Sequence, residues 1–169
     1  MKYVSLTGMF VIIMFSSINA QNFTIGANIG LPTGDFSKAY TFNVAIDASY
    51  LWEVSEKFEF GISSGYNHSI GNKIAASTSS YGFKDFQFFP IAGATRFNVS
   101  DRFTLGADIG FGISVTSQYD DDTNGLYYRP MIGYTLNEKI QLTTSYLSFD
   151  SNAGTGVYST IDIGISYHF

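Results

Sequence analysis

The chain has 169 residues, enough for one domain, and it contains no cysteine, so no disulfide framework can stabilise it. Its formal net charge is -5, and no basic stripe is present to meet phosphates, which argues against a nucleic-acid partner. The 17 glycines and only 3 prolines favour a fold of many twisted strands.

Residues 1–20 read as a segment that is removed from the mature protein. A basic start at Met1-Lys2 is followed by a mostly apolar run from Val4 to Phe15 and by small residues that end at Ala20. This pattern predicts a secretory signal peptide, cleaved after Ala20, and a mature domain over residues 21–169. The run is shorter than the roughly 20 apolar residues of a membrane-spanning helix. Cleavage removes Lys2 and changes the net charge from -5 to -6.

Apolar and polar residues alternate with a period of two, which predicts strands with one apolar face. The first four strands are expected at 22–31, 41–52, 58–67 and 85–97. The fourth has the least certain phase, because Phe86 and Phe88 fall on the inner face with Arg96, and Pro90 removes a backbone donor in mid-strand. A β-bulge at Pro90 would reconcile these facts. Its outward residues are expected to be Phe89, Ile91, Thr95 and Phe97.

Four more strands follow, at 103–114, 126–136, 140–147 and 157–169. The first of them alternates most cleanly, whereas the second carries Pro130 in an uncomfortable mid-strand position. The last strand ends the sequence on an aromatic residue. Its outward residues are Ile161, Ile163, Ile165, Tyr167 and Phe169, and its inward residues are Asp162, Gly164, Ser166 and His168.

The connections between the eight strands alternate between long loops and short turns. In membrane barrels the short turns and both termini lie in the periplasm, and strands of about ten residues cross the lipid. The pattern therefore predicts an all-β, eight-stranded, antiparallel up-and-down transmembrane barrel. A soluble lipocalin-like barrel is the alternative, but a face of Gly, Ser and Thr suits a narrow interior better than a soluble exterior. A girdle of aromatic rings at the membrane interface is expected from Tyr50, Trp52, Phe58, Phe97, Phe103 and Tyr134.

Two stretches resemble a known family. The segment F-F-P-I-A-G-A-T-R-F-N (88–98) and the terminal Tyr167-x-Phe169 are similar to those of small eight-stranded outer-membrane barrels, of the OmpA/OmpX-like and Bacteroidota porin-family type. The resemblance implies a monomer in a Gram-negative outer membrane, in contact with lipid and lipopolysaccharide and bound by the barrel-assembly machinery during biogenesis. The assembly signal would comprise Asp162, Gly164, Tyr167 and Phe169.

Charged residues on the inward faces form the main candidate site. They are Asp47, Glu59, Arg96, Asp108, Arg129 and Asp162. Glu59 and Arg96 lie near the same, periplasmic end of neighbouring strands, so they could pair. The set can be a salt-bridge network that plugs the lumen or a filter for ions. Plugging is favoured because eight strands leave an interior just wide enough for side chains.

A catalytic or metal site finds less support in the sequence. Ser151-Asn152 resembles part of the H-x-S-N motif of outer-membrane lipid A deacylases, but Phe149 occupies the position of the base. His68 reads as a surface residue and His168 as a polar lumen residue, because neither has the partners of a triad. The run Asp120-Asp121-Asp122 lacks the ligand spacing of a calcium loop. We therefore predict no enzyme activity, no metal and no cofactor.

The expected function is structural or interactional, with four exposed loops as the contact surface for a partner that the sequence does not identify. The loop at 69–84 is either disordered or a protruding sheet. Two alternatives remain open. One is a small porin-like channel, and the other is a lipid-modifying enzyme, which the missing histidine disfavours.

Overall fold

The computed structural model describes residues 23–76, 79–116, 124–151 and 156–169. The expected signal peptide (1–20) and the Asp120–Asp122 run lie outside the described residues. Ten strands and one short helix are present: β1 (Phe23–Thr33), η2 (Gly34–Phe36), β2 (Tyr40–Ser55), β3 (Phe58–Gly71), β4 (Lys73–Ala76), β5 (Ser79–Gly82), β6 (Phe86–Asn98), β7 (Phe103–Ser114), β8 (Gly125–Asn137), β9 (Ile140–Ser151) and β10 (Val157–His168).

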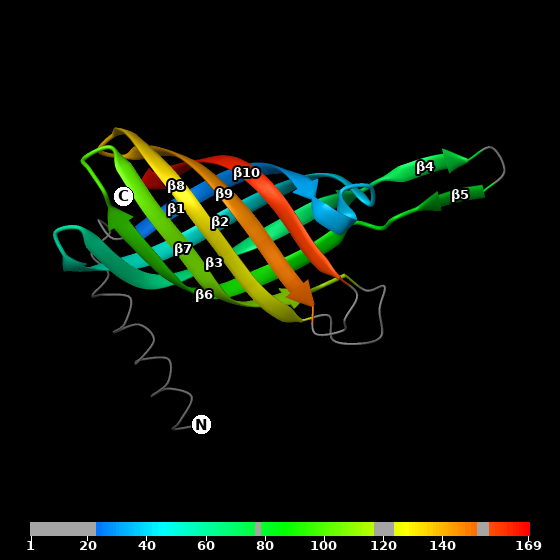
Figure 1. The fold of residues 1–169 in the computed structure, drawn as a ribbon, viewed down its shortest axis with the longest axis horizontal. Coiled ribbons are helices and arrows are strands. Elements are labelled where there is room, and N and C mark those ends of the chain that lie inside the picture. The colour runs from blue at the N-terminus through cyan, green and yellow to red at the C-terminus, as the bar shows by residue number, and fades with distance from the viewer. Residues whose placement is uncertain (1–22, 77–78, 117–123, 152–155) are drawn as a thin grey trace, which may run out of the picture.

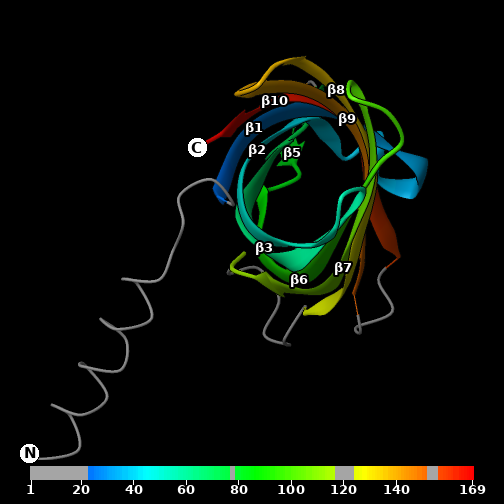
Figure 2. The same ribbon diagram turned by 90° about the vertical axis from the view of Figure 1, so that its left-hand side faces the viewer.

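Eight of these strands form one closed antiparallel barrel in the order β1-β10-β9-β8-β7-β6-β3-β2 (Figures 1 and 2). The last strand closes the barrel against the first, in a register that runs from Thr24 opposite His168 to Thr33 opposite Ser159. Closure leaves no unpaired strand edge in the wall. The structure thus confirms the eight-stranded up-and-down barrel that the alternation predicts.

The two ends of the barrel differ, and we call them the turn end and the loop end. The short turns after β2, β6 and β8 lie at the turn end, together with Phe23 and Phe169, whose rings are 5.7 Å apart. The longer connections lie at the loop end. There β4 and β5 pair as a hairpin that projects beyond the barrel (Figure 1). Of the two alternatives for the 69–84 loop, the structure thus shows the protruding sheet, after a β3 that extends to Gly71.

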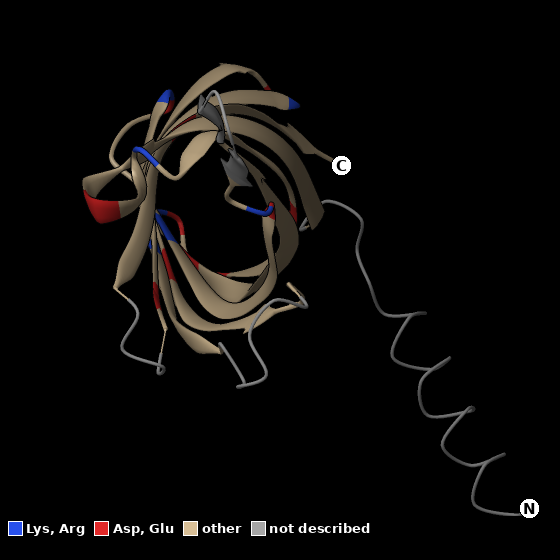
Figure 3. Cartoon of the chain, turned by 90° about the vertical axis from the view of Figure 1, so that its right-hand side faces the viewer, with Lys and Arg blue, Asp and Glu red and all other residues tan. Residues whose placement is uncertain are grey.

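Inward and outward residues alternate along the strands as expected. The outer wall is apolar, with large exposed side chains such as Ile29, Ile62, Ile109 and Ile163. Few residues of the strands are charged (Figure 3), and Arg96, Asp108, Arg129 and Asp162 among them are buried. Because apolar side chains face outward and polar ones face inward, the arrangement is that of a lipid-embedded barrel rather than a soluble one. Among the described residues, no helix is long and apolar enough to cross a membrane.

The expected β-bulge at Pro90 is wrong. The pairing of β3 with β6 keeps one register from Phe58–Phe97 to Ser69–Phe86 and skips only the two pairs around Pro90. Pro90 faces the lumen, and the ladder omits the hydrogen bond that its missing N–H cannot donate. Pro130 has the same effect between β8 and β9, where the register is also unchanged. A closed barrel tolerates these gaps because the opposite ladder of each strand stays continuous.

A second correction concerns the end of β9. The alternation predicts that this strand ends at residue 147 and is followed by a loop, whereas β9 continues to Ser151. The extension places Phe149 inside the barrel, where it is buried. Asn152 of the deacylase-like motif lies outside the described residues.

Candidate functional site

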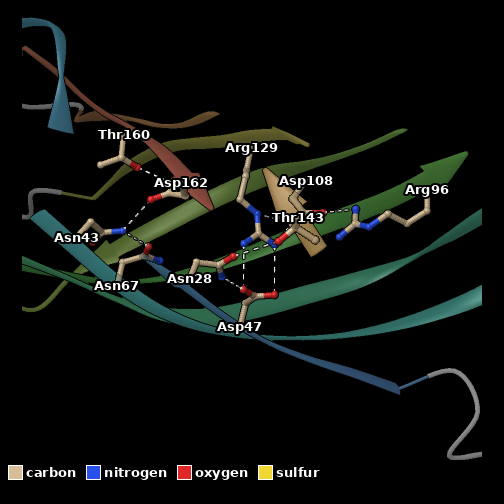
Figure 4. A network of polar contacts seen from close by, with 10 residues as sticks. All are labelled: Asn28, Asn43, Asp47, Asn67, Arg96, Asp108, Arg129, Thr143, Thr160 and Asp162. Carbon is tan, nitrogen blue, oxygen red and sulfur yellow. Dashed lines mark hydrogen bonds and ion pairs between the residues drawn. The ribbon is translucent and has the colours of Figure 1, made fainter. Parts of the chain in front are cut away.

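Asp108 is the centre of an ion-pair network in the middle of the lumen (Figure 4). Arg96 on β6 donates from Nη1 to Asp108 Oδ1 over 2.7 Å. Arg129 on β8 donates to Asp108 Oδ2 from Nη2 over 2.7 Å and from Nε over 3.1 Å. Asp108 is 0% exposed, so its charge is balanced entirely by the two guanidinium groups. A carboxylate without these partners would be very costly to bury.

Arg129 carries the network across the lumen to the opposite wall. Its Nη1 lies 3.1 Å from Asp47 Oδ1 on β2. Asn28 on β1 also donates to Asp47, and Thr143 on β9 donates to Asn28 over 3.5 Å. The network therefore joins β7 and β8 to β1, β2 and β9, and it links strands that are not neighbours in the wall.

Asp162 on β10 belongs to a separate set of hydrogen bonds with uncharged partners. Thr160 donates to Asp162 over 2.8 Å, and Asn43 donates to it over 3.5 Å. Among the residues that the structure describes, no cationic group lies within ion-pair distance of Asp162, although its exposure is only 2%. The buried acids Asp108 and Asp162 and the partly buried Asp47 thus share the two cations Arg96 and Arg129 in the part of the lumen that the structure describes.

The pair that the sequence suggests between Glu59 and Arg96 is not formed. The two residues are cross-strand neighbours, but Arg96 turns to Asp108, and Glu59 accepts a hydrogen bond from Asn98 over 3.1 Å. Gly106 allows this turn because a Cβ at Gly106 would lie 2.7 Å from Arg96 Cδ. The absence of a side chain at Gly106 on β7 therefore selects the partner of Arg96.

A layer of buried aromatic residues lies across the lumen on the loop-end side of the network. Phe88, Tyr127, Phe149 and Tyr158 are each no more than 3% exposed, and the rings of Phe88 and Phe149 are 4.9 Å apart. Tyr40, at the start of β2, packs edge-on against Tyr158 at 5.6 Å. Tyr158 is hydrogen-bonded to Ser69, which donates to Asn43 over 3.0 Å. Hydrogen bonds thereby connect this layer to the set around Asp162.

On the turn-end side of the network the lumen is hollow. A polar cavity of about 120 Å³ reaches from His168 and Glu59 at its mouth to Asn28, Asp47 and Arg129 at its floor. His168 faces inward, as expected, and lies 3.2 Å from the Thr24 hydroxyl. The cavity therefore opens at the turn end, and the ion-pair network forms its floor.

The residues of the expected aromatic girdle lie on the outer face, towards the turn end of their strands. Tyr50 and Trp52 pack at 5.0 Å, and Phe103 and Tyr134 pack at 5.1 Å. Of the expected assembly signal, Tyr167 points outward, whereas Asp162 and Gly164 face the lumen.

The two histidines and the deacylase-like motif are not brought together. His68 lies on the outer face near the loop end, 2.9 Å from Asp85, whereas His168 lies at the turn end. Phe149, at the position of the base, packs in the aromatic layer. Within the described ranges, no group of three or more acidic, histidine or cysteine residues could hold a metal ion.

Sequence reasoning missed several members of the lumen site. The neutral ones in the network are Asn28, Asn43, Asn67, Thr143 and Thr160, and those in the aromatic layer are Tyr127, Phe149 and Tyr158. The same alternation places Tyr127 on the inner face, because its neighbour Tyr128 points outward. It also places Tyr158 on the inner face, because Tyr158 lies three residues before the outward Ile161. Neutral amides and hydroxyls carry no charge pattern, so only a fixed register could have identified their partners.

Comparison with known proteins agrees with this architecture. Solved structures with the same fold include Ail of Yersinia pestis (15% identity, TM-score 0.56, 87% of this chain and 96% of that chain). Also similar is the N-terminal β-barrel domain of Pseudomonas aeruginosa OprF, with 9% identity and a TM-score of 0.54, over 88% of this chain and 98% of that chain. Neisserial surface protein A has 18% identity and a TM-score of 0.52, over 88% of this chain and 97% of that chain. No curated protein sequence matches the chain.

A family model described as "Outer membrane protein beta-barrel domain" matches residues 5–169. The match covers nearly the whole chain, and the membrane named in that description agrees with the apolar outer wall. The chain therefore belongs to the outer membrane β-barrel family and resides in the outer membrane.

Proposed function

We propose that the protein is a closed outer-membrane anchor that presents its loop end, including the β4–β5 hairpin, to partners at the cell surface. The observation that carries this proposal is the pair of side-chain layers that cross the lumen. The aromatic layer and the ion-pair network lie one above the other, and each bridges opposite walls of the barrel. An eight-stranded barrel has no spare width through which solutes could bypass them.

The apolar outer wall indicates which molecules would surround such an anchor. The apolar outer face would contact lipid and lipopolysaccharide, and the outward rings near the turn end would form the interfacial girdle. The outward Tyr167 and the terminal Phe169 would present the assembly signal to the barrel-assembly machinery. A lipid-modifying activity is not part of the proposal, because Phe149 is enclosed in the aromatic layer and cannot accept a proton.

Purified protein reconstituted in planar bilayers is expected to give no steady single-channel steps, because both layers must open before ions can pass. Protease treatment of intact cells should cut within the projecting hairpin and leave the barrel intact. A related large porin, added to the same bilayers, serves as the positive control for insertion. Steady conductance steps from the folded protein would replace the closed anchor with the small-channel alternative.

A further inference from the structure

The blind cavity at the turn end is the feature that the proposed function leaves unused. It has a volume of about 120 Å³, room for about four waters, and a wider depression lined by the three turns leads into it. The cavity and the depression share five lining residues, so the two spaces form one continuous vestibule. The shared residues are Glu59, Asn98, Thr104, Gln141 and His168.

The vestibule is lined by negative charge along its length. Its carboxylates are Asp47, Glu53, Glu56, Glu59, Asp101 and Glu138. Two of the cations at the turn end face away from it. Arg102 donates to the outward Tyr134 over 3.2 Å, and Lys139 lies 5.8 Å from the centre of the Tyr167 ring. Lys57 is the one Lys or Arg among the described residues that line the mouth.

The cations deeper in the vestibule are already neutralised. Arg96 pairs with Asp108, and Arg129 pairs with both Asp108 and Asp47. Glu53 and Glu59 therefore add uncompensated negative charge at the inner cavity. A cleft with charge of one sign and low-dielectric walls concentrates the opposite ion.

A second, independent observation lies in the cavity wall. Ser49, Ser145 and Ser166 line the cavity and are only 6%, 8% and 8% exposed. Among the described residues, no protein group forms a hydrogen bond with any of these three hydroxyls. Gly26 lies between Asp47 and Ser166 in the register of the wall, and because it has no side chain, the Asp47 carboxylate can lie over it, where a Cβ would be 2.8 Å from Asp47 Oδ2. Hydroxyls that face a cavity and have no protein partner are free to hydrogen-bond to water or to a ligand that enters it.

We propose that this vestibule binds a small organic cation with N–H donors, of the alkylammonium or guanidinium class. The carboxylates supply the attraction, and the buried serine hydroxyls with Asp47 accept the hydrogen bonds. A tightly ligated metal ion fits less well, because the described residues contain no cluster of three or more metal-binding side chains. The inference is independent of the surface role, since the ligand enters from the turn end and does not cross the barrel.

The test is a titration of the folded barrel in nanodiscs with methylguanidinium chloride, followed by backbone amide shifts at constant ionic strength. We expect saturable shifts at Ser49, Ser145 and Ser166 and none at the loop end. Glu59→Gln should weaken binding about five-fold, the effect of one water-screened charge at close range. Asp150→Asn, which removes an equal charge at the exposed loop end, is the matched control and should leave the affinity unchanged.

The proposal is overturned if sodium acetate at the same ionic strength produces the same shifts, or if Glu59→Gln and Asp150→Asn weaken binding equally. Blocking the cavity by Ser166→Leu should abolish the shifts while the protein keeps its heat-dependent gel mobility. Shifts that persist in a folded Ser166→Leu barrel would place binding outside the vestibule and would also contradict the proposal. Bilayer conductance tests the closed anchor separately.

Discussion

Asp108→Asn is expected to lower the free energy of unfolding by about 3–5 kcal/mol, the usual cost of removing one partner from a buried ion pair. The loss is large because Asp108 is the shared partner of Arg96 and Arg129 at 2.7 Å each. In the variant, Arg96 keeps only the Thr95 carbonyl, and Arg129 keeps Asp47. Urea titration of the refolded barrel in lipid vesicles, with folding followed by gel mobility, measures this difference.

Asp162→Asn is the matched control, because it makes the same chemical change in the same lumen. Asp162 is hydrogen-bonded to Thr160 and Asn43 but has no ion pair among the described residues. An amide can replace a carboxyl group there with little loss, so the free energy of unfolding should change by less than about 1 kcal/mol. Equal losses for the two variants would show that Asp108 is not distinguished by its two arginines.

The contrast between these two acids also shows what the sequence could predict. Alternation places both of them on the inner face, since the period of two depends only on neighbouring residues. It does not say which charges meet, because that depends on the register between strands and on where glycines leave room. Gly106 directs Arg96 to Asp108 and away from Glu59, although Glu59 is its direct neighbour across the strands.

The sequence was limited in the same way in predicting the strand register and the aromatic residues in the lumen. Pro90 suggested a bulge, but the barrel accommodates this proline by omitting a hydrogen bond and keeps its register. Phe149 was not predicted to lie in the aromatic layer, because it follows a strand whose outward apolar residues end near Tyr146. Its burial depends on Phe88, which comes from the distant strand β6, and on Tyr158, its cross-strand partner on β10. Such contacts become visible only after the barrel is closed.

Ile163→Lys tests whether the outer face of the barrel wall contacts lipid. Ile163 lies midway along β10, faces outward and is 61% exposed. In lipid, a cation at the midplane of a barrel costs about 2–4 kcal/mol, because it loses its hydration. If the same wall faced water, the substitution would be almost neutral, since exposed surface changes seldom exceed about 0.5 kcal/mol. Urea unfolding in vesicles should therefore show a large loss.

The same substitution near the membrane interface provides the control. Phe97→Lys lies on the outer face close to the turn end, where the cost of a cation falls to about 0–1 kcal/mol, apart from the loss of the ring. Ile163→Lys should also lose more stability in thicker bilayers, because its ammonium group then lies further from water, whereas Phe97→Lys should respond little. A loss at Ile163 that is small and independent of bilayer thickness would contradict a lipid-facing wall, because depth in hydrocarbon is the only difference that lipid imposes between the two positions.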